Sequence, residues 1–556
     1  MSQYSIGLDY GTSSVRGLLV DVQSGEELAS SVFPYPHGKA GILLDERDPD
    51  VARQHPQDYL DGAQSVIKGI LEQAAEAYPA FTPDQVIGIG VDTTGSTPMP
   101  VDAVGAPLAL KLEYEGNLAA MVYLWKDHTA HAEAAEITAL AAKTRPQFLA
   151  KCGGAYSAEW YWAKVLRCLH AAPEVFDAAH TWVEHSDWLP AVLTGETHPD
   201  RLKRDICAAG HKAMFHPEWG GYPDEEFLAA LDPRLVRLRR TLPDHAFHVG
   251  EVAGTLSAEW AERTGLPVGI PVSIAAFDAH LGGVGSGIKP GALVKNIGTS
   301  TCDMMVSPLD SDLGDIPGLC GIVPESILPS FYGLEAGQSA VGDIFNWFVS
   351  GIQPAGQGHE ELTEGASKLL PGESGLLALD WHNGNRTILV DQRLTGGIIG
   401  LTLQTTPAEM YRAWIEATAF GSRIIMERFE EYGQKVESII NCGGISVKNP
   451  LVMQIYADVM GRPIAISRSA QTAALGSAIA GAVAAGAYPS FAEATAAMTG
   501  LHPRVFQPDP ARQAVYDRLY ALYHRFHDAF GVRGTRDDLW DVMKELLAIR
   551  DEARHV

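Results

Sequence analysis

A short turn of glycine followed by hydroxyl residues occurs twice between apolar strands, once in each half of this chain. The first copy is IGLDYGTSSVRGLLVD at 6–21, and the second is LVKNIGTSTCDMMV at 293–306. Glycine lets a backbone approach an oxyanion closely, and the amides and hydroxyls of such a turn can donate to phosphate. One copy would be ordinary hairpin punctuation. Two copies indicate a duplicated domain with a nucleoside triphosphate between the halves.

The two copies differ at one position, two residues before the glycine. Asp9 precedes Gly11 in the first copy, whereas Asn296 precedes Gly298 in the second. Only the first copy therefore brings a carboxylate to the phosphates, and Mg²⁺ prefers oxygen ligands. The pattern predicts a magnesium site at Asp9, bound directly or through water. The alternative is that both residues merely flank a turn.

Bulk composition narrows the class of protein. The chain has 556 residues, which is too long for one core and predicts two large domains. Its net charge of −26 argues against nucleic acid or an anionic membrane as a partner. The six cysteines form no C-x-x-C pair, which is typical of free thiols in a reducing cytoplasm. The Ala/Gly-rich run at 473–488 is shorter than the roughly 20 residues of a membrane span, so we expect a buried helix.

Strand and helix patterns repeat in the two halves. The expected elements are strands at 4–10, 15–21, 27–33 and 86–92 with a helix at 56–76, then hairpin strands at 292–306, a helix at 407–432, strands at 438–444 and 463–468, and a helix at 471–486. Strands that end in polar or glycine loops before helices predict a mixed sheet with ligands at the carboxyl ends of the strands. We expect domains at 1–268 and 269–556, and an insertion or loop at 351–375.

Longer motifs resemble those of one enzyme family over essentially the whole chain. They are GLDYGTSSVRG (7–17), SAEWYWAKVL (157–166), AAFDAHLGGVGSG (275–287), KNIGTSTCD (295–303), YRAWIEATAFGSRIIME (411–427) and CGGISVKNPLVMQIYADVMGRPI (442–464). Together they resemble the FGGY carbohydrate kinases of the actin/hexokinase/Hsp70 superfamily. The resemblance implies an α/β fold of two duplicated actin/hexokinase-like (ribonuclease H-like) domains around an interdomain cleft. It also implies ATP and Mg²⁺ as cofactors.

The loops that face the sugar in this family are most similar to those of its ribulokinase branch. The matching stretches are GVDTTGSTP (90–98), LWKDHTA (124–130), AGHKAMFHPEWGG (209–221) and LEAGQSAVGDIFNWF (334–348). The similarity implies ATP-dependent phosphorylation of L-ribulose to L-ribulose 5-phosphate in arabinose and pentose catabolism. Glycerol kinases place an Arg-Glu pair where Gly95 and Ser96 stand, and xylulokinases place Gln-Met-His across 94–96. The Gly-Ser pair cannot grip glycerol by charge-assisted hydrogen bonds, and it leaves more room.

Phosphoryl transfer to a sugar hydroxyl requires positioning, charge neutralisation and a proton acceptor. The resemblance places the catalytic base at Asp278, in AAFDAH after an apolar strand-like run. A carboxylate between apolar neighbours would have a raised pKa, which suits a base. The alternative is that Asp278 caps the helix expected from about residue 280.

The resemblance assigns the nucleotide to small and hydroxyl residues of both halves. They are Thr12, Ser13, Gly298, Thr299, Gly443, Gly444 and Asn449. The two turns would bind the β- and γ-phosphates, and the glycine pair would let adenosine lie against bare backbone. Alternatively, Gly443 and Gly444 form an ordinary tight turn, and Asn449 starts a helix.

For the sugar, the resemblance implies Ser96, Lys212, Asp278 and Glu335 as ligands, with Trp125 and Asp127 as possible pocket walls. Lysine donates three hydrogens and glutamate accepts two or more bonds, so the pair suits a polyol. The alternatives are a surface lysine and a solvated strand end.

Three functions stay open at this point. The first is the L-ribulose kinase described above, and the second is a kinase for another pentulose or pentitol, such as D-ribulose or ribitol. The third is a non-catalytic sugar sensor on the same fold, although a pure binder has no need of the base Asp278. The expected partners are a small-molecule sugar and ATP. The resemblance leaves a homodimer or a larger homo-oligomer open.

Overall fold

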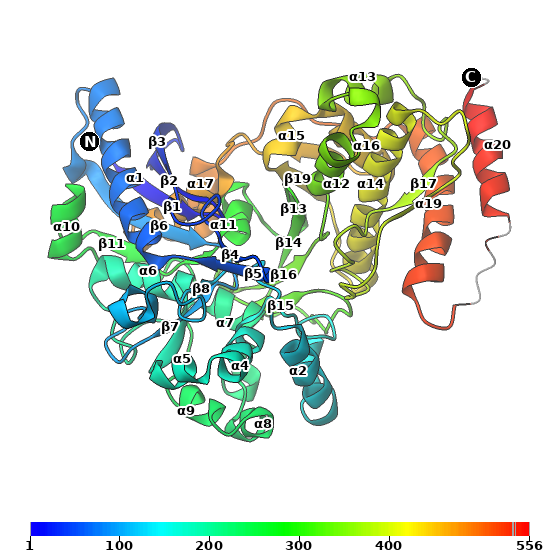
Figure 1. Cartoon of the computed structure of the whole chain (residues 1–556). Helices are drawn as coiled ribbons and strands as arrows, with labels where there is room; N and C mark the ends of the chain where they lie inside the picture. Colours follow the sequence, from blue (N-terminus) through cyan, green and yellow to red (C-terminus); the bar gives the residue numbers. More distant parts are fainter. Residues whose placement is uncertain (1, 536–538, 540, 555–556) are drawn as a thin grey trace.

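The computed structural model describes residues 2–535, 539 and 541–554 of the chain. It has two lobes, each built on a β-sheet, with an extra group of helices below the first lobe (Figure 1). No helix in this described part is long and apolar enough to cross a membrane.

The first sheet has the strand order β10-β11-β6-β1-β2-β3, and β12 also pairs with β6. Its strands are β1 (Tyr4–Tyr10), β2 (Ser14–Asp21), β3 (Glu27–Pro34), β6 (Val86–Thr93), β10 (Val252–Thr255), β11 (Pro271–Ser273) and β12 (Ala276–Phe277). β1 and β2 form the antiparallel hairpin, whereas β6 runs parallel to β1. The carboxyl ends of β1, β6 and β12 therefore meet at one edge of this sheet.

The second sheet has the order β15-β16-β14-β13-β19-β20. Its strands are β13 (Ala292–Ile297), β14 (Thr301–Pro308), β15 (Gly321–Pro324), β16 (Phe331–Ala336), β19 (Ser438–Cys442) and β20 (Ile464–Ile466). An antiparallel hairpin is again followed by parallel strands, because β13 pairs with β14 on one side and with β19 on the other. The expected duplicated α/β architecture is confirmed.

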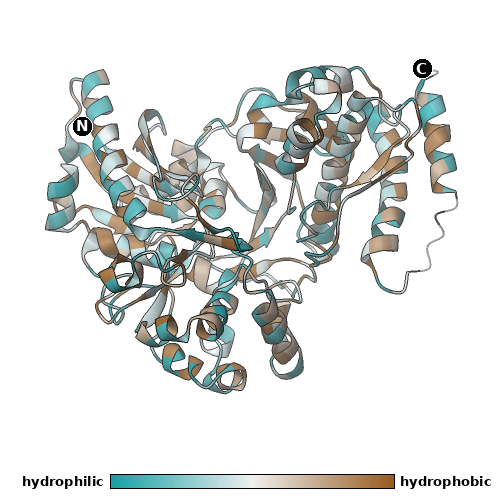
Figure 2. Cartoon of the chain, in the orientation of Figure 1, coloured by the Kyte–Doolittle hydropathy of each residue, from teal (hydrophilic) through white to brown (hydrophobic). Residues whose placement is uncertain are grey.

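Helices cover the sheets with their apolar sides (Figure 2). The main ones are α1 (Pro56–Ala77), α2 (His131–Thr144), α4 (Tyr161–Ala171), α6 (His185–Thr194), α7 (Ile206–Lys212), α11 (Asp278–Gly285), α13 (His359–Ser367), α14 (Pro407–Glu431), α16 (Pro450–Met460), α17 (Thr472–Ala484) and α19 (Pro510–Gly531). In α1, Pro56 occupies the first turn and the His55 side chain accepts from the amide of Gln57. Tyr59, Val66 and Ile70 form part of its buried face, at helical spacing.

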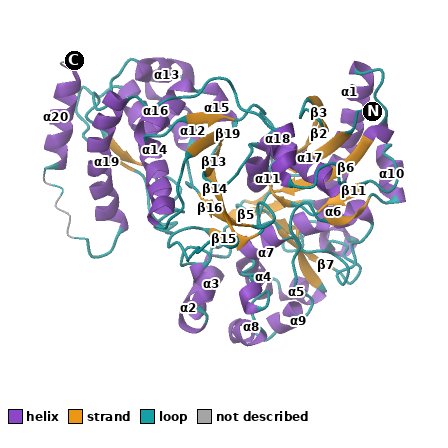
Figure 3. Ribbon diagram, turned by 180° about the vertical axis from the view of Figure 1, so that it is seen from behind, coloured by secondary structure: helices purple, strands orange, loops and turns teal. Residues whose placement is uncertain are grey.

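Helix α17 comes from the second half of the chain but packs on the first sheet, and α11 and α17 lie between the two sheets (Figures 1 and 3). Glycines in the strands of the first sheet allow α17 to approach closely. A Cβ on Gly7 would lie 1.8 Å from the carbonyl oxygen of Ala474, and one on Gly90 would lie 1.7 Å from that of Ser477. The predicted buried helix is thus correct, and its glycine-lined contacts form the joint between the lobes.

Two expected boundaries differ from the structure. A division at 268/269 would cut the first sheet, because β11 and β12 pair with β6 beyond that point. The segment 351–375 contains helix α13, so the expectation of a loop was wrong for that part. Only Leu362 and Ala366 of α13 are buried, which is too few apolar positions to show a helical period in the sequence.

Candidate active site

A cavity of about 740 Å³ lies where the two lobes meet, and residues of both lobes line it. Six of the predicted site residues border this cavity: Thr12, Lys212, Asp278, Gly298, Thr299 and Glu335. They come from segments separated by most of the chain. The duplicated sheets therefore bring their strand ends to one shared space.

Three aspartates cluster at the carboxyl edge of the first sheet. Asp9 of β1 lies opposite Asp92 of β6 in the parallel register, and Asp278 directly follows β12, which pairs with β6 at Asp92 and Thr93. Ser477 of α17 donates to Asp92 Oδ2 at 2.5 Å, while Asp92 Oδ1 is buried without a partner. The cluster therefore has one buried carboxylate oxygen, Asp92 Oδ1, that lacks a donor.

Burial and mutual repulsion raise the pKa values of this cluster. Burial, reinforced by the Asp9 carboxylate, raises the pKa of Asp278 to about 7. Burial raises the pKa of Asp9 as well, and Arg16, 3.4 Å away, opposes that shift. The pKa of Asp92 lies well above its usual value, again through burial and then through Asp9. Such a crowded set of carboxyl groups favours binding of a cation.

These carboxylates fit a hard divalent ion. Their ligand atoms are all oxygens, and no neighbouring side chain donates to the buried Asp92 Oδ1. The Asp9 side chain is 14% exposed, although Asp9 does not border the cavity, whereas Asp92 is fully buried. Asp9 is therefore the better direct ligand, with Asp92 behind it.

The first hydroxyl turn is tied to its surroundings at Thr12. The amide of Gly11 donates to the carbonyl of Ser14 at 3.0 Å, which closes the turn. Gln54 Nε2 donates to the Thr12 carbonyl at 2.8 Å, and the indole of Trp125 donates to Thr12 Oγ1 at 3.0 Å. The Ser13 side chain is exposed beyond this turn. Trp125 therefore walls the cavity and also positions Thr12.

The second hydroxyl turn has no charged side chain at the equivalent place. The Gly298 amide donates to the Ser300 carbonyl at 3.0 Å, and the carbonyl of Thr299 accepts from the amides of Val341 and Asp343. Gly298 and Thr299 are both exposed to the cleft. The amide and hydroxyl of Thr299 can donate to an anion without a competing carboxylate, whereas the Gly298 amide is already used within the turn.

Gly443 lies beside the second turn, and Asn449 lies further away. Gly443 has φ +90°, and a Cβ there would lie 2.4 Å from the carbonyl oxygen of Ile297. Gly444 has open space where a Cβ would be. Asn449 caps α16 by accepting from the amide of Val452 at 3.2 Å, so the structural alternative accounts for its side-chain oxygen. None of the three borders the cavity.

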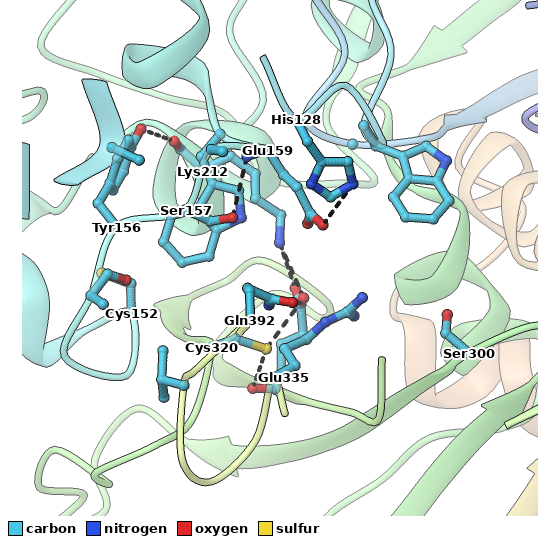
Figure 4. Close-up of a pocket in the computed structure, with 18 of the residues that line it drawn as sticks. His128, Cys152, Tyr156, Ser157, Glu159, Lys212, Ser300, Cys320, Glu335 and Gln392 are labelled. Carbon is cyan, nitrogen blue, oxygen red and sulfur yellow. Dashed lines mark hydrogen bonds and ion pairs between the residues drawn. The ribbon is translucent and has the colours of Figure 1, made fainter. Parts of the chain in front are cut away.

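An ion pair between the lobes borders the cavity at two residues that the resemblance assigns to a sugar (Figure 4). Lys212, the last residue of α7, donates to Glu335 of β16 at 3.1 Å, and both side chains are less than a tenth exposed. Although burial opposes it, the Lys212 charge and the His280 and His211 side chains hold the pKa of Glu335 well below its usual value. Glu335 is therefore an anion that accepts bonds, and neither predicted alternative, surface lysine or solvated strand end, describes the pair.

Two histidines surround Glu335 without forming a convincing metal site. Ligand atoms of His211, His280 and Glu335 lie within 4.8 Å of one another. However, Lys212 already supplies the counter-charge of this carboxylate, and a divalent ion would lie against a buried ammonium group. The arrangement therefore suits a fixed carboxylate better than a metal.

Ser96 and Asp127 are the predicted pocket residues that the structure turns away from the cavity. Ser96 is fully buried, and its hydroxyl donates to the buried carboxylate of Glu184. Asp127 accepts from the amide of Ala52 at 2.8 Å and pairs with Arg53. Both side chains are occupied by internal partners, so neither has a free group to offer a sugar.

Sequence reasoning missed Asp92 and the outer wall of the cavity. Asp92 had a visible signal, because IGVDTTG at 89–95 repeats the I-G-x-D pattern of IGLDYGT at 6–12. The outer wall includes Arg386, and also His128, which lies 3.8 Å from Glu159 (Figure 4). Arg386 lies in an irregular loop that no periodic pattern marks.

Comparison with known proteins matches two family models to most of the chain. Residues 4–285 match the N-terminal domain of the FGGY family of carbohydrate kinases, and 293–485 match its C-terminal domain. A ribulokinase of Geobacillus thermodenitrificans is 43% identical over 99% of this chain and 98% of its own length. One of Vibrio parahaemolyticus is 42% identical over 94% of this chain and 95% of its own length.

Solved structures show the same fold at low sequence identity. A xylulose kinase from Rhodospirillum rubrum has a TM-score of 0.76 at 24% identity, covering 95% of this chain and 99% of its own. A glycerol kinase from Plasmodium falciparum, solved with ADP, has a TM-score of 0.76 at 16% identity, covering 96% of this chain and 99% of its own. With both of its domain models matched and full-length relatives above 40% identity, this chain belongs to the FGGY family of carbohydrate kinases.

Proposed function

We propose that this carbohydrate kinase transfers the γ-phosphoryl group of ATP to the terminal O5 hydroxyl of L-ribulose. The observation that carries the proposal is the shared cavity, in which Asp278 and the Lys212–Glu335 pair face the two hydroxyl turns. Full-length relatives named ribulokinase support the choice of sugar. The product would enter pentose catabolism.

In this proposal each lobe has its own task. Lys212 donates to sugar hydroxyls and Glu335 accepts from them, which orients the chain of the sugar. Asp278 takes the proton of the attacking hydroxyl, and its pKa of about 7 makes it a better acceptor than an ordinary aspartate. Thr12 and Ser13 bind phosphate from the first lobe, and Gly298 and Thr299 bind it from the second.

Asp9, with Asp92 behind it, would hold the Mg²⁺ that accompanies ATP. When bound, the ion neutralises phosphate charge and orients the phosphates. Gly443 and Gly444 would let the adenosine lie against backbone. Asn449 would contact the nucleotide through its amide nitrogen, which also donates to Thr363 Oγ1 at 3.4 Å, because its side-chain oxygen caps α16. Closure of the lobes would exclude water as a competing acceptor.

The proposal also places the domain division between residues 285 and 293, so that β11 and β12 stay in the first sheet. It includes a cytoplasmic location, because all six cysteines are free thiols.

The test is an ADP-release assay with Mg-ATP and a panel of acceptors: L-ribulose, D-ribulose, L-xylulose, D-xylulose, ribitol and glycerol. We expect the highest kcat/KM for L-ribulose. A preference for D-ribulose or ribitol would keep the kinase and replace the sugar. No turnover with any acceptor, together with measurable sugar binding, would favour the sugar-sensing alternative.

A further inference from the structure

A buried lysine and a buried glutamate both bind one loop of the cavity. The loop is residues 94–97, which follows β6, and its Thr94 and Gly95 border the cavity. Lys164 of α4 is fully buried, and Glu184, at the end of β9 (Thr181–Glu184), is 3% exposed. Neither side chain borders the cavity itself. Their effect on a bound sugar must therefore act through the loop.

Glu184 binds the loop through both of its carboxylate oxygens. One oxygen accepts from the hydroxyl of Ser96, and the other accepts from the amide of Thr97 at 2.6 Å. A buried carboxylate that accepts hydrogen bonds from a hydroxyl and from an amide holds both groups strongly and in a fixed direction. This anchor fixes both the side chain of Ser96 and the backbone that follows it.

Lys164 binds the backbone of two cavity loops at once. Its ammonium donates to the carbonyl of Ser96 at 2.8 Å and to that of Leu124 at 2.9 Å. Leu124 directly precedes Trp125, which borders the cavity and donates to Thr12. One buried cation therefore sets the spacing between the loop at 94–97 and the loop that carries Trp125.

The loop in turn touches the residue before the proposed base. A Cβ on Gly95 would lie 1.8 Å from the ring of Phe277, so the loop backbone packs directly against that ring. Phe277 borders the cavity and precedes Asp278. A small displacement of the loop would therefore disturb both the sugar wall and the neighbour of Asp278.

The same polar network reaches the helix that carries Lys212. Asp187 accepts from the amides of Glu184 and Asp205, and Asp205 caps α7 by accepting from the amide of Ala208 at 2.6 Å. α7 ends at Lys212. The loop at 94–97 and the sugar-binding lysine are thus held by one continuous set of buried hydrogen bonds.

We propose that Lys164 and Glu184 are positioning residues for the acceptor sugar, which fix the loop at 94–97 in the shape that admits it. The inference rests on the proposed sugar-kinase function and deepens it. It also reassigns Ser96, whose hydroxyl binds Glu184 and acts on the sugar only through the loop. Burial lowers the pKa of Lys164 to about 7 and raises that of Glu184 to about 7, and the charge of each group opposes the shift of the other.

The experiment measures KM for sugar and for ATP separately in Lys164→Met and Glu184→Gln. We expect the sugar KM to rise at least tenfold in each variant. The ATP KM should change less than twofold in Glu184→Gln, whereas in Lys164→Met it also responds to the loop of Trp125, which bonds Thr12. Quenching of the cavity tryptophans gives the sugar Kd without turnover and is expected to shift by the same factor. If the folded variants keep the sugar KM of the parent chain, or if both KM values rise together in Glu184→Gln, the inference fails.

A matched control separates positioning from general loss of stability. Arg412 and Glu416 form an ion pair of similar burial within α14, and both bond the hydroxyl of Tyr516 in α19. We expect Arg412→Met to lower Tm as much as Lys164→Met does, with the sugar KM unchanged. A parallel rise in sugar KM in this control would mean that the effect reports stability alone.

The variant Ser96→Ala distinguishes an effect through Glu184 from a direct contact of Ser96 with the sugar. It can be measured even if Lys164→Met fails to fold. If Ser96 acts through Glu184, the double variant Ser96→Ala/Glu184→Gln should have the same sugar KM as Glu184→Gln alone. If the effects of the two single substitutions on the sugar KM multiply in the double variant, Ser96 contacts the sugar directly and the reassignment is wrong. The assay uses whichever panel sugar the parent chain turns over best. Failure of L-ribulose alone would count against the proposed function and leave this inference testable.

Discussion

The two hairpins of the duplicated sheets have the same backbone but different charge. In the first lobe, Asp9 lies beside Asp92 in the strand register. At the matching register of the second lobe, Asn296 lies beside Cys442. Both lobes keep the glycine turn, but only the first keeps the carboxylates. In the proposed mechanism both turns bind phosphate, whereas the metal and the proton chemistry belong to the first lobe alone.

The largest expected effect tests the acidic lobe. In Asp278→Asn the side chain can no longer take a proton, and we expect kcat to fall by about 10²–10⁴-fold, the usual range for a general base. The Kd of ATP should change less than threefold, because the nucleotide is assigned to other residues. Single-turnover kinetics and equilibrium nucleotide binding measure the two quantities. Lost ATP binding in a folded variant would show that Asp278 has a different role.

The second prediction exchanges the two residues at which the hairpins differ in charge. Asp9→Asn makes the first turn resemble the second, and we expect about a 10²-fold lower rate with a weaker dependence on Mg²⁺. Asn296→Asp makes the second turn resemble the first, and we expect about a tenfold weaker ATP affinity, through repulsion between the new carboxylate and phosphate. Magnesium titrations of rate and of ATP binding measure both. An unchanged magnesium titration in Asp9→Asn would remove Asp9 from the metal site.

Much of the fold could be predicted because its signals are local. The strands, the two turns and the small-residue helix α17 each lie within a short stretch of sequence. The direction in which α17 packs could not be predicted, because its contacts with Gly7 and Gly90 join residues from opposite ends of the chain. Helix α13 was missed for another reason, since only two of its residues are buried.

The residues of the candidate site also divide into those that the sequence predicts and those that it does not. Asp9, Gly298 and Thr299 follow from the repeated turn, and Asp278, Lys212 and Glu335 follow from family resemblance. Ser96 was placed on the sugar by resemblance, but a sequence does not show that a glutamate 88 positions away accepts its hydroxyl. Buried polar partners of this kind come from distant segments, so a local pattern cannot reveal them.

The third prediction compares adjacent glycines beside the second hairpin. In Gly443→Ala the new Cβ would lie 2.4 Å from the Ile297 carbonyl at a φ of +90°, and we expect a loss of about 1–3 kcal/mol in unfolding free energy. ADP binding should weaken severalfold, because the second turn must shift. Gly444→Ala is the matched control, since nothing lies within 4 Å of its new Cβ. Equal Tm values for the two variants, measured by calorimetry, would contradict the strained-turn argument.

The smallest expected effect concerns the titration of Asp278 and links the proposed base to the charge asymmetry of the hairpins. Burial and then the Asp9 carboxylate raise the pKa of Asp278 to about 7. Asp9→Asn removes the second cause, so the pKa should fall, although burial keeps it above the ordinary value of about 4. Carboxyl titration of the nucleotide-free protein, with Asp278→Asn as the blank, measures this shift.

A protonated base cannot accept a proton, so sugar turnover should decline as pH falls through this pKa, and Asp9→Asn should move that decline to lower pH. A pKa near 4 in the parent chain would mean that the cleft hydrates Asp278 freely. An unshifted value near 7 in Asp9→Asn would mean that burial alone raises it, and the proton chemistry of the first lobe would then be independent of its metal-binding residue.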